Sequence, residues 1–349
     1  MSAVIAIVGA TGTGKSALAD ALAHMLGGEV ISADSMQVYR GMDIGTAKVP
    51  FAERSTPYHG IDLVTPDYAY TAALYQRDAR AAIKDIYARG HVPIMCGGTG
   101  LYLRAALDDF AFDENRENHE NRENPEDNHE NNHENNHENP SPSSSVFHTT
   151  HRAELTAQAE AMGAAAFHAK LAECDPASAA LIHPNNTRRV IRAFELLEAK
   201  TTYAQQQAGF SEYKAFYPTR YIGIEVAPAV LYEAINQRVD ALMQAGLLDE
   251  VRLLVAAGYQ NAPGFSQAIG YKELLGVLAE TEELKTAVEQ IKQATRRYAK
   301  RQRTWFRRDD RIHWINATDL HEQRLAKTLG TKDFTRVLLR RALDTLEQF

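Results

Sequence analysis

Near its start the chain reads Val4-Ile5-Ala6-Ile7-Val8-Gly9-Ala10-Thr11-Gly12-Thr13-Gly14-Lys15-Ser16. The five apolar residues have the length and composition of a buried strand, and the segment after them fits the pattern G-x-x-x-x-G-K-[ST]. A helical pattern follows at once, with apolar residues at Leu18, Ala21, Leu22 and Met25. A glycine-rich loop between a strand and a helix N-terminus directs backbone amides at phosphate oxygens, while Lys15 adds a charge and Ser16 a hydroxyl for Mg²⁺. The sequence therefore predicts a di- or triphosphate site, with Ser16 as a metal ligand, formed by Gly9, Ala10, Thr11, Gly12, Thr13, Gly14, Lys15 and Ser16.

The segments that follow predict a parallel α/β sheet. Besides residues 4–8, strands are expected at residues 29–33, 91–96 and 220–226, with a helix at 72–88. The order strand, loop, helix, strand implies right-handed crossovers and parallel pairing. Further helices are expected at residues 152–181, 229–257, 271–278, 284–307 and 332–348. The predicted fold is an α/β P-loop parallel-sheet core with a helical insertion domain and a helical C-terminal region.

An acidic Asn/Glu/His repeat interrupts the chain. Residues 113–145 contain no Ala, Val, Ile, Leu, Met, Phe, Trp, Tyr or Cys. A segment with nothing to bury does not offset the entropy of ordering, so we expect disorder there. The alternative is a helix that aligns His129, His133 and His137 for a metal ion, which the frequent Asn residues disfavour. The expected domains are a core of residues 1–112 and 183–349, the repeat at 113–145, and a helical insertion at 146–182.

The net charge of the 349 residues is −7, which on its own argues against a nucleic-acid partner. Most of that charge belongs to residues 113–139, which hold ten acidic residues and two arginines. The rest of the chain carries 36 basic and 35 acidic residues and is close to neutral. The average charge therefore does not exclude an RNA partner.

Two basic segments point to nucleic acid. Residues 292–311 carry nine Lys or Arg against two Asp, together with Tyr298, Trp305 and Phe306. Residues 188–192 add three arginines. Such runs on helices often only face solvent. Two of them in one chain with a phosphate site favour RNA as the partner.

Targeting signals are not evident. The two cysteines, Cys96 and Cys174, cannot form a disulfide framework, and the N-terminus has no basic region followed by a cleavage site. No apolar run approaches the roughly 18 residues that span a bilayer. We expect a cytoplasmic protein that has no membrane partner and acts as a monomer.

Asp34 and Thr99 follow the second and third predicted strands. Ligands bind beyond the carboxyl ends of parallel strands, so both residues should lie beside the phosphate loop. There a carboxylate can act as a general base and a hydroxyl can bond a leaving phosphate oxygen. A helix N-cap for Asp34 and a turn role for Thr99 are the alternatives. A kinase would need a magnesium-binding acid at a strand end, and only Glu225 offers one.

Taken together, these residues resemble the bacterial-type tRNA dimethylallyltransferases, also called tRNA isopentenyltransferases. The most specific blocks are Asp34-Ser35-Met36-Gln37-Val38-Tyr39 and Gly97-Gly98-Thr99-Gly100-Leu101-Tyr102, whereas the phosphate loop is less specific. The resemblance covers most of the chain outside residues 113–145. Similar segments also lie at residues 31–48, 58–64, 183–185, 269–273 and 300–307.

The resemblance implies transfer of the dimethylallyl group from dimethylallyl diphosphate to N6 of the adenosine 3′-adjacent to the anticodon of tRNA. Asp34 would be the catalytic base and Thr99 would bond the diphosphate, while Lys15 and Ser16 with Mg²⁺ would neutralise it. Gln37 would read the flipped adenine. The tRNA anticodon stem-loop would bind to Asp34, Ser35, Met36, Gln37, Arg152, Arg188, Arg189, Val190, Ile191, Arg192, Gln267, Ala268, Ile269, Gly270, Tyr271, Lys272, Lys300, Arg301, Gln302, Arg303, Thr304, Trp305, Phe306 and Arg307.

The chain departs from the family pattern at four positions, one of which is Arg188, where glutamine is usual. Ala10 stands where proline is usual, and Ala229 and Ala234 stand where arginines are usual, although Arg238 is kept. Two other functions stay open on the residues alone. One is a P-loop nucleotide or small-molecule kinase that binds ATP, and the other is a non-catalytic RNA-binding protein switched by a nucleotide.

Overall fold

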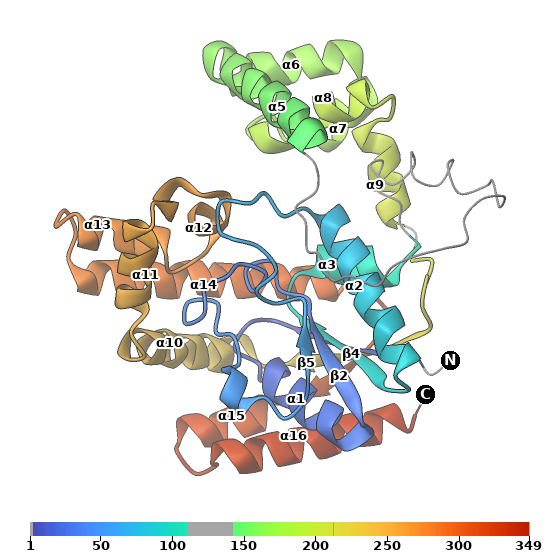
Figure 1. Cartoon of the computed structure of the whole chain (residues 1–349), viewed down its shortest axis with the longest axis vertical. Coiled ribbons are helices and arrows are strands. Elements are labelled where there is room, and N and C mark those ends of the chain that lie inside the picture. Colours follow the sequence, from blue (N-terminus) through green and yellow to red (C-terminus); the bar gives the residue numbers. More distant parts are fainter. Residues whose placement is uncertain (1–2, 110–141, 212, 349) are drawn as a thin grey trace, which may run out of the picture. The chain divides into compact units, whose positions relative to one another are not determined.

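A computed structural model describes residues 3–109, 142–211 and 213–348. The chain divides into two compact units, one formed by Met1–Asp109 and Ala215–Phe349 and the other by Phe110–Lys214. Figure 1 shows their elements coloured along the sequence. In the described residues no helix is both long and apolar enough to cross a membrane.

Six parallel strands form one sheet in the described part of the first unit, in the order β3-β2-β4-β1-β5-β6. Their bounds are β1 (Val4–Gly9), β2 (Gly28–Ser32), β3 (Tyr58–His59), β4 (Val92–Gly97), β5 (Thr219–Glu225) and β6 (Ile312–Asn316). The predicted α/β class is confirmed, and the four expected strands are present. Two strands were not predicted: β3 has only two residues, and in β6 the exposed residues His313 and Asn316 interrupt the apolar run.

Alternate residues of β1 point to opposite faces of the sheet, as the pleat requires. Val4, Ala6 and Val8 join one apolar cluster, and Ile5 and Ile7 join the other. The first cluster includes residues of α2 (Ala72–Ala88), α3 (Gly100–Leu107) and α14 (Leu284–Phe306). The second includes residues of α1 (Lys15–Leu26), α15 (Thr318–Leu325) and α16 (Thr331–Leu346), and Figure 1 shows α16 beside α1. Helices therefore cover both faces, which explains the nearly continuous apolar strands.

Three expected helices are divided. The predicted helix at residues 152–181 is made of the end of α5 (Pro142–Met162), α6 (Ala164–Cys174) and α7 (Pro176–Leu181), with breaks at Gly163 and Asp175. The predicted helix at residues 229–257 is α10 (Pro228–Gln244) followed by α11 (Leu247–Ala256), because Gly246 between them has a left-handed backbone with φ 101°. The predicted helix at 271–278 is a 3₁₀ turn, Lys272–Leu274, followed by α13 (Leu275–Leu278). Elements for which no range was predicted are the 3₁₀ turns Phe51–Glu53 and Tyr259–Asn261 and the helices α3, α8 (Thr187–Glu198), α9 (Tyr203–Ser211), α12 (Pro263–Gln267) and α15.

The second unit is helical and has its own apolar core. Its helices are α5 (Pro142–Met162), α6 (Ala164–Cys174), α7 (Pro176–Leu181), α8 (Thr187–Glu198) and α9 (Tyr203–Ser211). Leu155, Phe167 and Leu171 pack with Val190 and Leu196 in one cluster. Because residues of α8 belong to this core, the second unit extends beyond residue 182, where we expected the helical insertion to end. Up to residue 141 the repeat lies outside the described residues. Residues 142–145, which we expected to be disordered, form the first turn of α5.

Candidate active site

The phosphate loop connects β1 to α1, as its sequence predicts. Gly14 is left-handed, with φ 93°, and a Cβ there would lie 2.8 Å from the Phe334 ring, so only glycine fits. Thr13 Oγ1 donates to the carbonyl of Ala10 at 2.9 Å, and Lys15 Nζ donates to the same carbonyl at 2.5 Å. The loop is thus fixed by its own side chains, at a helix N-terminus suited to an anion.

Strand register brings the neighbouring loops to the phosphate loop. Gly97 of β4 pairs with Val8, and Cys96 pairs with Ser32 at the end of β2. The backbones approach so closely that a Cβ on Gly97 would lie 2.1 Å from the Ala33 carbonyl oxygen. The segments that follow β1, β2 and β4 therefore meet at one edge of the sheet, where ligands of parallel α/β sheets bind.

A cavity of about 1230 Å³ opens at this edge. Its wall combines the phosphate loop with residues of the loop after β2 and of helices α10 and α14. The polar or charged side chains most relevant to chemistry there are Lys15, Ser16, Asp34, Gln37, Arg238, Tyr298, Arg301 and Gln302. A space of this size accommodates a diphosphate and a nucleobase together.

Asp34 and Thr99 shape one turn beside the cavity. Asp34 Oδ1 accepts from the Met36 N–H at 2.9 Å, and Thr99 Oγ1 accepts from the Ser35 N–H at 3.1 Å. Asp34 lines the cavity, whereas Thr99 lies behind its wall. The aspartate therefore combines a turn-stabilising bond with access to the cavity, and the Thr99 hydroxyl holds the turn that carries it.

Burial governs the electrostatics of the cavity. It raises the pKa of Asp34, against the opposing effects of the Met36 N–H and of the Lys15 and Arg238 charges. Burial lowers the pKa of Lys15 to about 8, and it lowers the pKa of Arg238 as well. A partly desolvated carboxylate with a raised pKa is a good proton acceptor, and the two cations beside it suit an anionic ligand.

Gln302 of α14 ties two loops of the site together. Its Oε1 accepts from the Thr11 N–H at 2.8 Å, and its Nε2 donates to the Gly98 carbonyl at 3.0 Å. Its side chain is buried, with 5% of the residue exposed. We expected Gln302 to contact tRNA, but both ends of its amide are engaged with the phosphate loop and the loop after β4.

The other residues of the basic segment at 300–307 differ in their surroundings. Arg303 Nη2 lies 3.5 Å from Glu225 Oε1, and Arg307 forms an ion pair with the same carboxylate. Phe306 is buried in the core. The indole of Trp305 packs against Gly100, where a Cβ would come within 1.9 Å of its Nε1. Lys300, Arg301 and Thr304 are exposed, and of these Arg301 also lines the cavity.

The segment Gln267 to Lys272 also divides by position. Its cavity-lining members are Gln267, Ala268, Ile269, Gly270 and Lys272. Tyr271 is fully buried, and its hydroxyl donates to Glu250 Oε1 at 2.6 Å. We correct the expectation for Tyr271, because its side chain has no surface to offer a tRNA.

The predicted tRNA residues of the helical unit also separate into two groups. Val190 and Ile191 are buried on the inner face of α8, so their side chains are unavailable to RNA. Arg192 and Arg152 lie 3.3 Å and 3.0 Å from the Glu195 carboxylate. Arg188 and Arg189 are exposed. The expectation that Val190 and Ile191 contact tRNA is wrong for their side chains, because helical spacing turns them into the core.

A divalent metal ion would find few protein ligands here. Among the described residues no group of three or more His, Cys, Asp and Glu side chains is placed to hold a metal. Among the residues that line the cavity, Ser16 offers a hydroxyl at the phosphate loop and Asp34 offers a carboxylate. This donor set fits Mg²⁺, which keeps several waters and is usually shared between one or two protein oxygens and substrate phosphates.

Three residues that the fold brings to the site were not among the predicted site residues. Arg238 was noted only as an arginine kept in the pattern, Tyr298 only as an aromatic residue in a basic segment, and Glu250 not at all. Tyr298 faces the cavity, and burial raises its pKa to about 12. The sequence signal that could have found Tyr298 is the 3.6-residue period of α14, which puts Tyr298 on the same helix face as Gln302.

The fold and the cavity define an α/β P-loop protein with a buried acid beside its phosphate site. Family models described as "IPP transferase" and "Isopentenyl transferase" match residues 37–309 and 2–55. A tRNA dimethylallyltransferase of Geobacillus thermodenitrificans is 42% identical over 318 residues, which are 90% of this chain and 91% of that protein. One of Bacillus subtilis is 41% identical over 325 residues, 93% and 94% of the two chains.

Solved structures match the chain as well. The tRNA isopentenylpyrophosphate transferase of Bacillus halodurans matches with a TM-score of 0.62 and 35% identity, covering 100% of this chain and 98% of that one. A eukaryotic dimethylallyltransferase acting on tRNA matches with a TM-score of 0.70 and 28% identity, covering 92% and 75%. The chain belongs to the IPP transferase family, and it is therefore a transferase.

Proposed function

We propose that the protein transfers the dimethylallyl group of dimethylallyl diphosphate to the N6 amine of the adenosine 3′-adjacent to the anticodon of tRNAs, with release of diphosphate. The names of its relatives support this substrate pair. The observation that carries the proposal is Asp34, a carboxylate of raised pKa that lines the same cavity as the phosphate loop. We expect the protein to act in the cytoplasm as a monomer.

The phosphate loop would hold the diphosphate of the donor. Lys15 uses one N–H on the Ala10 carbonyl and has two further donors for phosphate oxygens. Arg238 lines the same cavity and supplies a second positive charge. Ser16 would hold Mg²⁺ on the diphosphate, where the ion would neutralise the charge that develops on the leaving group.

Asp34 would act as the general base. The N6 lone pair forms a bond to C1 of the dimethylallyl group while the bond from C1 to the diphosphate oxygen breaks. The proton that N6 loses passes to the Asp34 carboxylate, and the electron pair of the broken bond leaves with the diphosphate. Thr99 would support this step through the turn that carries Asp34. Gln37 would meet the adenine after it leaves the base stack.

Exposed cations of both units would bind the RNA backbone. In the first unit these are Lys272, Lys300 and Arg301, and in the second Arg188 and Arg189. A stem-loop suits such a surface, because its unpaired bases can be splayed out for reading while its phosphates contact Lys and Arg.

The test is mass analysis of tRNA before and after incubation with dimethylallyl diphosphate and Mg²⁺. We expect the mass of one C₅H₈ unit to be added to the nucleoside 3′ of the anticodon. Parallel reactions with labelled ATP address the kinase alternative, which the ion pairs of Glu225 with Arg303 and Arg307 disfavour. RNA binding that depends on a nucleotide and yields no modified nucleoside would instead support a non-catalytic RNA-binding protein.

A further inference from the structure

Residues 45–48 line one side of the cavity, and the segment of residues 42–48 to which they belong is held by a side chain of α11. Three consecutive backbone N–H groups, those of Asp43, Ile44 and Gly45, donate to the Glu250 carboxylate at 2.9, 2.7 and 3.0 Å. The Tyr271 hydroxyl donates to the same carboxylate at 2.6 Å. A carboxylate that receives four hydrogen bonds fixes the segment in one conformation, since the bonds to a charged acceptor are strong.

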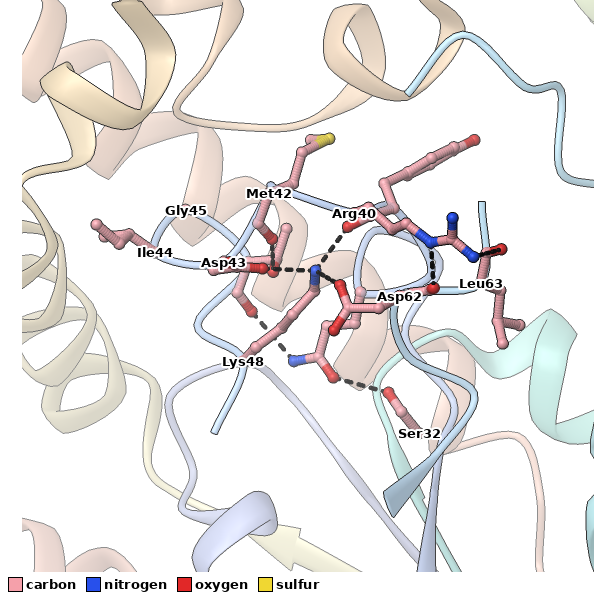
Figure 2. Close-up of polar contacts among 12 residues, drawn as sticks. Ser32, Arg40, Met42, Asp43, Ile44, Gly45, Lys48, Asp62 and Leu63 are labelled. Atoms are coloured by element: carbon pink, nitrogen blue, oxygen red, sulfur yellow. Dashed lines mark hydrogen bonds and ion pairs between the residues drawn. The ribbon is translucent and has the colours of Figure 1, made fainter. Parts of the chain in front are cut away.

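Lys48 closes the other end of this segment. Its Nζ donates to the Tyr39 carbonyl at 2.6 Å, to Asp43 Oδ1 at 2.7 Å and to Asp62 Oδ1 at 2.5 Å. These contacts use all three donors of an ammonium group whose side chain is only 3% exposed. Figure 2 shows them converging on Lys48 between Asp43 and Asp62.

The consequence for Gln37 lies in the direction of its side-chain amide. Ser32 Oγ donates to Gln37 Oε1 at 2.7 Å, and Gln37 Nε2 donates to the Thr46 carbonyl at 3.2 Å. A carbonyl can only accept, so the position of Thr46 requires the nitrogen of the amide to face it. Oε1 and the second N–H of Gln37 then take fixed places at the cavity wall. A glutamine amide oriented in this way can pair with N6 and a ring nitrogen of adenine.

We infer that Glu250 and Tyr271 are positioning residues for adenine recognition, acting through the Thr46 carbonyl on the Gln37 amide. This inference rests on the proposed function. Glu250 holds residues 43–45 in place, the next carbonyl in the chain belongs to Thr46, and that carbonyl orients Gln37. Neither Glu250 nor Tyr271 lines the cavity, so their effect is on how the acceptor base is presented.

The experiment is a double-mutant cycle on a tRNA anticodon stem-loop. In Glu250→Gln an NH₂ group replaces one oxygen and faces N–H or O–H donors, so the segment shifts. We expect kcat/KM for the RNA to fall about tenfold or more, as misplacement of a reacting group does, while KM for dimethylallyl diphosphate changes less than twofold. In a Gln37→Ala background the same change is expected to have almost no further effect, because the residue it acts through is gone.

Asp249→Asn is the matched control, since Asp249 is exposed on the same helix and its carboxylate pairs with Arg252. It is expected to behave as the wild type. Tyr271→Phe removes one hydrogen bond to Glu250 and keeps the ring against Phe265. It therefore replaces Glu250→Gln in the cycle if Glu250→Gln is unstable. A smaller loss, of about threefold, is expected in the same parameter, and again only when Gln37 is present.

Two results would overturn the inference. One is an equal loss of kcat/KM from Glu250→Gln, or from Tyr271→Phe, with and without Gln37. The other is a rise in the KM for dimethylallyl diphosphate as large as the loss of kcat/KM for the RNA. Either would make the contact a general support of the fold. Failure of the proposed function is distinct, because then the wild-type protein would not modify the stem-loop at all.

Discussion

Gln302 accepts a hydrogen bond from the backbone N–H of Thr11 at 2.8 Å, although 291 residues separate the two in sequence. The bond joins the helix that carries the basic segment to the loop that would hold the donor. Gln302→Ala leaves the Thr11 N–H and the Gly98 carbonyl without their partner, at a cost of about 1–3 kcal/mol. We expect KM for dimethylallyl diphosphate to rise about tenfold in steady-state kinetics. An unchanged KM together with weaker tRNA binding would instead return Gln302 to the RNA surface.

Asp34→Asn tests the proton acceptor. The amide keeps the acceptor oxygen for the Met36 N–H but cannot take a proton, so we expect kcat to fall roughly 10²-fold or more with an unchanged melting temperature. In the wild type the reactive form is the carboxylate. Because burial raises the pKa of Asp34, we expect the rate to begin to decline at a higher pH than it would with an aspartate of ordinary pKa. Near wild-type transfer by Asp34→Asn would remove the residue from the mechanism.

Lys15 gives the donor site a pH dependence on the alkaline side. Burial lowers the pKa of its ammonium group to about 8 in the free protein, and an anionic ligand binds the charged form. The affinity for dimethylallyl diphosphate should therefore fall as pH rises above 8, by up to about tenfold per pH unit. Calorimetric titration at pH 7, 8 and 9 measures this, with Lys15→Met as the comparison. Parallel pH profiles for the two proteins would contradict the assignment.

Glu29 lies near the start of β2, at the end of the strand away from the cavity. We expect it to make the stability of the fold depend on pH in acid. Burial would raise its pKa, but hydrogen bonds from Arg89, His59 and His91 outweigh burial and lower it to about 2. A carboxylate with a depressed pKa stabilises the fold above its unfolded pKa, near 4, and this stabilisation is lost as pH falls toward 2. Glu29→Gln should lower the free energy of unfolding by about 2 kcal/mol at pH 7.

The difference between Glu29→Gln and the wild type should shrink between pH 4 and pH 2 in urea titrations. A difference that stays constant over this range would show that the charge of Glu29 contributes little and that packing explains the loss.

Arg301 and Arg303 are expected to differ, although they lie two residues apart. Arg301 is exposed and lines the cavity, whereas Arg303 is within 3.5 Å of Glu225. If Arg301 contacts a phosphate, Arg301→Ala should reduce the slope of log Kd for tRNA against log salt by about one. Arg303→Ala should leave the slope nearly unchanged. Equal slopes in all three proteins would mean that this end of α14 only faces solvent.

The parts of the fold that the sequence predicted are those encoded locally. The phosphate loop, its strand and its helix are consecutive, and α2 coincides with its predicted range of residues 72–88. The break at Gly246 was missed because an isolated glycine is tolerated inside many helices, and the left-handed φ depends on tertiary packing. Strand β6 was missed because its five residues gain their burial from β5 and not from their own pattern.

The site was predictable where chemistry stands at a strand end, as for Asp34, and not where it depends on long-range pairing. Glu250 bonds a segment more than 200 residues away, and Gln302 bonds one at 291 residues. Residue type alone made Gln302 and Tyr271 look like RNA contacts, because a basic or polar segment does not reveal which of its members face inward. Helical spacing decides this for Val190 and Gln302, whose side chains lie on inner helix faces. Tyr271 lies in the turn before Lys272–Leu274 and is buried by tertiary packing.

The interleaved strand order has a consequence for the growing chain on the ribosome. β1 lies between β4 and β5, so one of its edges has no partner until residue 219 and those after it have emerged. The helical unit, with a core of its own, lies wholly before that point. The phosphate loop acquires its Gln302 bond later still. Donor binding is thus one of the last properties that synthesis confers, and a nascent chain would carry its phosphate-loop motif long before the loop could function.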